Sequence, residues 1–178
     1  MTTFARMKRS DHSMLPPTPL ATMAFESPNA CNHCHEDKDA AWADEWVRKW
    51  RKRDYQAPLM QRAELIDAAR KEDWTRLSEM LAYIKGKDRN AIFSTSLIRL
   101  LRACPDPAVW PVIMDAAKDP SPLVRSSAIE SLGRIPSKQT SEILLAATDD
   151  DIRLVRIKAA AALAGYPRFE LRNACLLY

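Results

Sequence analysis

The chain has 178 residues, of which 47% are apolar and 28% are charged, and its formal net charge at neutral pH is +4. Acidic and basic residues are interleaved along most of the chain, so nucleic-acid binding is not indicated, and no apolar run approaches the roughly 18 residues of a membrane-spanning helix. With three Gly and many Ala, Leu, Arg, Lys and Glu residues, the composition favours an all-α globular protein.

Residues 1 to 30 are predicted to form an irregular, proline-rich arm. Several prolines, among them Pro16, Pro17 and Pro19, oppose a continuous helix and favour extended or turn conformations. Because the arm also carries large apolar residues, we expect it to lie on an apolar surface. Ser27 as N-cap and Pro28 as first helical residue predict that a helix begins at the end of this arm.

Cys31, Cys34 and His35 form a C-x-x-C-H motif. Two thiols at this spacing lie nearly one helical turn apart and can form thioethers with the two vinyl groups of a porphyrin. The imidazole of His35 follows directly and can bind the iron as an axial ligand. The motif therefore predicts haem c, a covalently bound haem with its iron.

A zinc half-site and an unused pair of cysteines are the alternatives to haem. Structural zinc is held by four ligands, usually as two pairs, whereas Cys104 and Cys175 are isolated in the sequence and His12 is far from both. Haem is therefore the favoured interpretation. Cys104 and Cys175 are expected to be small core residues.

Residues 39–53 are predicted to form an amphipathic helix. Trp42, Trp46 and Trp50 recur every four residues and form one stripe, which must pack against the haem or against later helices. The basic residues at the end of this helix complement the helix dipole. An alternative role for them is to bind the haem propionates or an acidic redox partner.

From residue 56 onward the sequence predicts short antiparallel helices. We expect helices over 58–70 and 74–84, and then over 90–103 and 108–118. Residues 105–134 align with 136–165 at an offset of 31, so the repeating unit is a helical hairpin. The predicted inward positions are Val124, Ala128 and Leu132 in one copy, Val155, Ala159 and Leu163 in the next, and Ile92, Ser96 and Leu100 in a looser copy before them.

The segment from Asp119 to Arg125, Asp-Pro-Ser-Pro-Leu-Val-Arg, resembles a HEAT repeat, and residues 150–163 resemble a second. In such repeats the turn aspartate and the helix arginine usually form a hydrogen-bonded ladder between neighbours. The resemblance implies that role for Asp119, Arg125, Asp150 and Arg156. It also implies protein-protein contacts through the helical repeats.

The first 50 residues are similar to the last haem segment of bacterial multihaem c-type cytochromes that continue into HEAT and tetratricopeptide repeats. The similarity rests on His12, Met14 and the two prolines after them, on the Ser-Pro-Asn-Ala that precedes the motif, and on the three tryptophans. It implies electron transfer, with a redox partner protein or other haem-bearing segments as partners. No catalytic constellation accompanies the motif, so we do not expect an enzyme.

The compartment and the sixth iron ligand follow from the haem prediction. Haem is joined to C-x-x-C-H outside the cytoplasm, so we expect a periplasmic protein. Residues 1–9 lack the apolar region of a signal peptide, and we therefore expect that the chain is part of a longer polypeptide or that its gene start is wrongly assigned. His12 is a candidate sixth ligand, either of this iron or of another haem, and Met14 and Met23 are alternatives.

The sequence as a whole predicts a c-type haem-binding segment at residues 1–55 and HEAT-like helical repeats at residues 56–178. The function that follows is an electron-transfer cytochrome segment with one covalent haem on a HEAT-repeat scaffold. The alternative is a HEAT-repeat interaction module in which the haem motif is vestigial or unloaded. The helical repeats are compatible with both.

Overall fold

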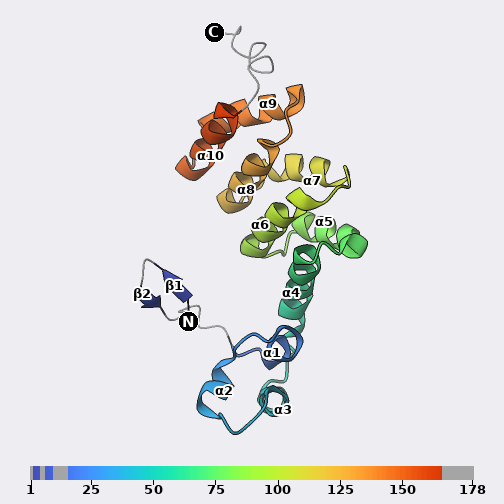
Figure 1. Cartoon of the computed structure of the whole chain (residues 1–178), viewed down its shortest axis with the longest axis vertical. Coiled ribbons are helices and arrows are strands. Elements are labelled where there is room, and N and C mark those ends of the chain that lie inside the picture. The colour runs from blue at the N-terminus through green and yellow to red at the C-terminus, as the bar shows by residue number, and fades with distance from the viewer. Residues whose placement is uncertain (1, 5–6, 10–15, 166–178) are drawn as a thin grey trace. The chain divides into compact units, whose positions relative to one another are not determined.

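The structure, a computed structural model, describes residues 2–4, 7–9 and 16–165 (Figure 1). The chain divides into two compact units, Met1–Ala63 and Glu64–Tyr178. The predicted boundary between residues 55 and 56 falls directly before helix α4, Ala57–Arg70, which continues across the division between the two units.

The first unit contains a small hairpin and short helices. Strands β1 (Thr2–Phe4) and β2 (Met7–Arg9) pair antiparallel. The helices that follow are α1 (Pro19–Phe25), α2 (Ala30–Cys34) and α3 (Ala40–Trp50), and α1 packs against α3. Ala43 and Val47 form the buried face of α3, with 1% and 4% of their surface exposed.

Two predictions for the N-terminal arm were wrong. Pro19 occupies the first turn of α1, where its missing N–H and fixed φ are compatible with a helix, so the arm is partly helical. Helix α2 begins at Ala30 and its N-cap is Asn29, not Ser27, because the Asn29 side chain accepts a hydrogen bond of 3.2 Å from the backbone N–H of Asn32.

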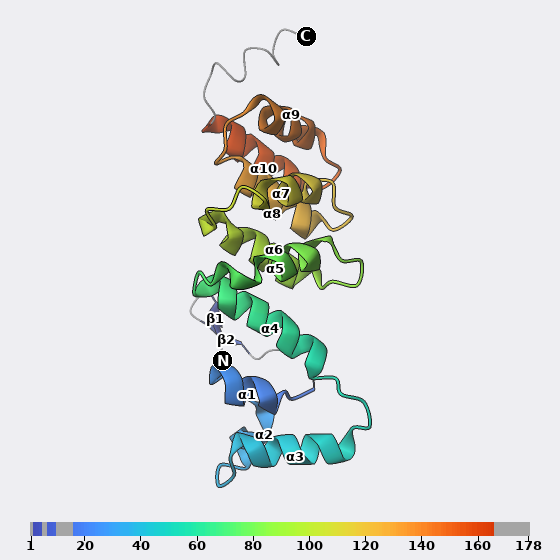
Figure 2. The same cartoon turned by 90° about the vertical axis from the view of Figure 1, so that its right-hand side faces the viewer.

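The second unit is a stack of helical hairpins, which Figure 2 shows one after another along the chain. Its α-helices after α4 are α5 (Leu77–Lys85), α6 (Ala91–Leu100), α7 (Val109–Ala116), α8 (Pro122–Leu132), α9 (Lys138–Ala146) and α10 (Arg153–Ala164), with 3-10 turns η1 (Trp74–Arg76), η2 (Leu101–Ala103) and η3 (Ala147–Asp149). Helix α8 contacts α6 on one side and α10 on the other, and α5 contacts α7. The predicted all-α solenoid is confirmed.

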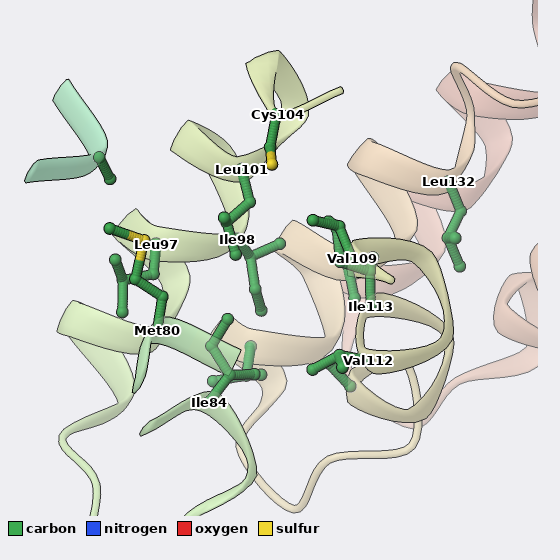
Figure 3. Packing of buried hydrophobic residues seen from close by; sticks show 14 of the residues in the cluster. Met80, Ile84, Leu97, Ile98, Leu101, Cys104, Val109, Val112, Ile113 and Leu132 are labelled. Carbon is green, nitrogen blue, oxygen red and sulfur yellow. The ribbon is translucent and has the colours of Figure 1, made fainter. Parts of the chain in front are cut away.

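The core of the second unit runs continuously between these helices (Figure 3). Met80, Ile98, Ile113 and Leu132 are completely buried. Cys104 is 5% exposed and packs in this core as predicted, whereas Cys175 lies outside the described residues.

The buried positions predicted for α8 and α10, in the last two hairpins, are confirmed. Those predicted for α6, in the looser copy of the repeat, were wrong. Each position in the two confirmed stripes is fully buried except Leu163, which is half-buried. Ile92 is instead 64% exposed. The side chains that α6 and η2 bury are Ser94, Leu97, Ile98 and Leu101.

Arginine-aspartate pairs join consecutive hairpins, as the HEAT resemblance implied for Arg125 and Asp150. Nε of Arg125 donates to Oδ2 of Asp150 at 2.8 Å, and Nη2 donates to Oδ1 at 2.9 Å. Asp119 pairs instead with Arg89, a residue that sequence reasoning missed. Arg156 donates to the backbone carbonyl of Asp150 at 2.7 Å.

A second charged network centres on Glu130 of α8. Its Oε1 lies 3.3 Å from Nζ of Lys158 on α10, and its Oε2 lies 3.4 Å from Nη2 of Arg102 and 3.6 Å from that of Arg99. Burial alone would raise the pKa of Glu130, but these cations together hold the pKa below its ordinary value. The network therefore links α8 to α6 and η2 in the preceding hairpin and to α10 in the following one.

Candidate haem-binding site

Helix α2 carries the C-x-x-C-H motif on a single turn. Cys31 and Cys34 lie in the helix, and His35 ends it by donating its backbone N–H to the carbonyl of Cys31 at 3.0 Å. Both thiols are free, Cys31 is half-buried, and Cys34 and His35 are exposed. The helical turn thus presents two accessible thiols and an imidazole close together.

These three side chains line a cleft of about 240 Å³ between α2 and α3. The residues that line it are Ala30, Cys31, Cys34, His35, Trp42, Ala43, Trp46 and Trp50. Apart from the motif residues, its walls consist only of alanine and tryptophan. The cleft therefore combines apolar walls with the two sulfur atoms and one imidazole.

The tryptophans form a continuous aromatic row that begins at His35. The ring centroids of His35 and Trp42 are 4.8 Å apart, those of Trp42 and Trp46 are 6.3 Å apart, and those of Trp46 and Trp50 are 5.8 Å apart. Trp46 is 38% exposed and Trp50 is 68% exposed. All three tryptophans line the cleft, whereas the buried side chains of α3 are Ala43 and Val47.

Side-chain amides fix α2 against its neighbours. Asn29 donates from Nδ2 to the hydroxyl of Thr22 at 2.9 Å and to Oδ1 of Asn32 at 2.8 Å. Asn32, which lies between the two cysteines, donates in turn to the backbone carbonyls of Lys38 and Asp39 at 2.7 and 3.2 Å. This chain of bonds holds the motif helix relative to the start of α3.

Gln56 connects α1 and α3 of the first unit. Its side chain is nearly inaccessible, with 2% of the residue exposed. Nε2 of Gln56 donates to Oδ1 of Asp44 on α3 at 2.7 Å, and Oε1 accepts from the backbone N–H of Leu20 on α1 at 3.2 Å. The hydroxyl of Tyr55 donates to the carbonyl of Pro17, and burial raises the pKa of Tyr55.

Sequence reasoning missed this supporting set of Asn29, Asn32, Asp44 and Gln56. Asn29 and Asn32 lie beside and within the C-x-x-C-H motif, but its spacing assigns no role to their side chains. Their common feature is that their side chains bond to groups outside the motif, six or seven residues away for Asn29 and Asn32 and twelve residues apart for Asp44 and Gln56. Only the fold brings those partners together.

The basic end of α3 is largely occupied by local interactions. Nε of Arg48 donates to Oδ2 of Asp44 at 2.7 Å, which raises the pKa of Arg48. Lys49 pairs with Glu45 at 2.6 Å and lies 4.6 Å from the Trp46 ring centroid. Arg51, Lys52 and Arg53 are exposed, and together with Tyr55 they line a second hollow of about 210 Å³.

Two further residues with a side chain that could bind iron, His33 and Met23, are described by the structure and do not line the cleft. His33 is exposed, and Met23 is 47% exposed on α1. His12 and Met14 lie outside the described residues. Within the described ranges, no group of three or more His, Cys, Asp or Glu side chains could hold a metal ion. A haem iron takes most of its ligands from the porphyrin itself, so a haem site does not require such a group of side chains.

Residues 77–164 match the family model of HEAT repeats. This range extends from the start of α5 to the end of α10, and it therefore contains the hairpins described above. The second unit is thus a helical repeat scaffold of the kind that supports protein-protein contacts. Neither a curated protein nor a solved structure matches the chain.

Within the part of the chain that the structure describes, no helix has the length and apolar character needed to cross a membrane.

Proposed function

We propose that the first unit binds a covalent c-type haem and that the chain is an electron carrier built on a HEAT-repeat scaffold. The observation that carries this proposal is that Cys31, Cys34 and His35 line one cleft together with an exposed row of tryptophans. The residues present fit the group that the motif implies.

The fit has a chemical and a physical part. Each free thiol can add across one vinyl C=C bond of the porphyrin, which gives a thioether and releases no other product. The imidazole of His35 would bind the iron. The exposed faces of Trp46 and Trp50 offer the apolar surface that a porphyrin would cover, and large aromatic side chains gain most from such burial.

When bound, the haem supplies a one-electron couple between Fe(III) and Fe(II). The chain's own residues would hold the group, shield it from water on the tryptophan side and keep the motif helix in place through Asn32. Lys52 and Arg53 are exposed cations available to haem propionates or to an acidic redox partner. We propose a carrier role without catalysis, in the periplasm.

The sixth ligand is part of the same proposal. His12 precedes the motif on a segment long enough to return to the haem, but it could equally serve another haem in a longer polypeptide, and Met14 is the alternative. The test compares His12→Ala with Met14→Ala in haem-loaded protein. A low-spin iron spectrum that changes only in the His12 variant supports His12 on this iron, and an unchanged spectrum assigns the ligand elsewhere.

The HEAT-repeat match favours a second candidate, a protein-interaction module whose haem motif is unloaded. The two functions differ in one property that is simple to measure. Protein exported to a bacterial periplasm with the haem maturation machinery should be red and show sharp visible bands on reduction. The double variant Cys31→Ala/Cys34→Ala should be colourless, and His33→Ala, in the same motif but exposed, should keep its colour. A colourless wild-type protein would favour the interaction module.

A further inference from the structure

The second unit contains a groove that the haem proposal does not use. It has a volume of about 510 Å³ and lies where the α5–α6 turn meets α7 and the α7–α8 turn. The residues that line it are Ile84, Lys85, Lys87, Arg89, Val112, Asp115, Ala116, Lys118, Asp119 and Pro120. Its volume is in the range of ligand-binding pockets.

The floor of this groove is apolar. Ile84 of α5 and Val112 of α7 are 3% and 4% exposed, and Figure 3 shows both side chains in the core. Ala116 is 6% exposed. Aliphatic side chains of a ligand could therefore contact the outer edge of the core through the groove.

The rim carries an excess of positive charge. Arg89 and Asp119 neutralise each other as an ion pair. The other charged side chains that line the groove are three exposed lysines, Lys85, Lys87 and Lys118, and one carboxylate, that of Asp115. The lining as a whole therefore has a net charge of +2. This excess favours an acidic ligand.

The walls of the groove are fixed before any ligand binds. Nη1 of Arg89 donates to the carbonyl of Gly86 at 2.8 Å, so the ion pair with Asp119 ties the α5–α6 turn to the α7–α8 turn. Oδ1 of Asp119 accepts from the backbone N–H of Ser121 at 2.8 Å. A site held in this way loses little conformational entropy on binding.

We propose that this groove binds an acidic linear segment of a partner protein in which Asp or Glu residues alternate with aliphatic ones. The aliphatic side chains would contact the apolar floor and the carboxylates would pair with the three lysines. A nucleic acid fits less well, because Asp115 and Asp119 line the same groove and the floor is apolar. The proposal does not depend on the haem.

The test measures fluorescence anisotropy of a short labelled peptide, in which Glu alternates with Leu and Ile, against the full chain. We expect saturable binding that weakens as salt increases. Peptides with Lys in place of Glu, or with Ser in place of Leu and Ile, should bind more weakly, as should a single-stranded DNA oligonucleotide.

The variant Lys85→Glu/Lys87→Glu/Lys118→Glu should lose affinity for the acidic peptide by about tenfold or more. The matched control is Lys138→Glu, an exposed lysine outside the groove that should bind like the wild type. The neutral triple variant with Gln at the same positions should lie between them, and circular dichroism checks that each variant is folded. Equal affinity of the folded triple variants and the wild type would overturn the proposal. Tighter binding of the oligonucleotide, or no binding of the acidic peptide, would also overturn it.

Discussion

Arg125 and Asp150 join successive hairpins through two parallel hydrogen bonds, of 2.8 and 2.9 Å, between a guanidinium edge and a carboxylate. Both side chains are largely withdrawn from solvent, with 17% and 14% exposed. The bonds from Arg125 hold the pKa of Asp150 below its ordinary value. Bidentate pairs of this kind are stronger than single-point surface ion pairs.

The variant Asp150→Asn should reduce the free energy of unfolding at neutral pH by about 1 kcal/mol. Because the folded pKa is lowered, the stabilisation is present above the ordinary aspartate value of about 3.9 and is lost as the pH falls through the folded value. Urea denaturation followed by circular dichroism should therefore show a difference between wild type and variant that shrinks in acid. The control Asp88→Asn changes an exposed aspartate and should be neutral. A difference that grows in acid would contradict the role of this pair.

Gly133 is required by a close approach between α8 and α10. Its φ of −59° is ordinary, but a Cβ at this position would lie 2.7 Å from Cβ of Ala162. Gly133→Ala should therefore destabilise the fold by about 1 kcal/mol or more, even after the entropic gain of removing a glycine. Thermal unfolding measures the effect. Gly165→Ala meets no close atom and should be tolerated, and adding Ala162→Gly to Gly133→Ala should restore part of the loss.

Ala159 lies at the contact between α10 and α8 and is completely buried. Ala159→Leu should overpack this contact and cost about 1 to 3 kcal/mol. Ala160→Leu, on the exposed side of the same helix, is the matched control and should have little effect. Chemical denaturation compares the two. Equal stability of both variants would show that the assigned face is wrong.

Asn32 fixes the C-x-x-C-H motif through its side-chain amide. In Asn32→Asp a carboxylate replaces the donor and faces the carbonyls of Lys38 and Asp39, so both bonds are lost. We expect faster amide hydrogen exchange in α2 and at the start of α3, with no change in α8 and α10. His33→Ala, the neighbouring exposed position, should leave exchange unchanged. Unaltered exchange in the Asn32 variant would mean that α2 is held by other contacts.

The sequence predicted those features that a short spacing encodes. The stripe of Val124, Ala128 and Leu132 repeats every four residues, and its burial is confirmed. The stripe of α6 was misplaced because apolar residues occur on both sides of that helix. The exposed Ile92 therefore fits a helical spacing as well as the buried Leu97 does. Only packing against α8 decides between the two faces.

Features that depend on contacts between distant residues could not be predicted. Arg89 lies in a turn, so the pattern of helix arginines gave no reason to pair it with Asp119. Gln56, the residue before α4, contacts α1 and α3, and its role as a buried bridge follows only from the fold. The cysteine motif itself was evident, but its position beside an exposed tryptophan row required the arrangement of α2 and α3.

Covalent attachment of haem can be measured from the intact mass of the exported protein under denaturing conditions. Thioethers survive unfolding, whereas axial iron bonds do not. We predict that denatured wild-type protein keeps the mass of one haem, that Cys34→Ala retains less haem, and that Cys31→Ala/Cys34→Ala retains none. A wild-type chain without haem mass, from cells that load a known c-type cytochrome, would contradict it.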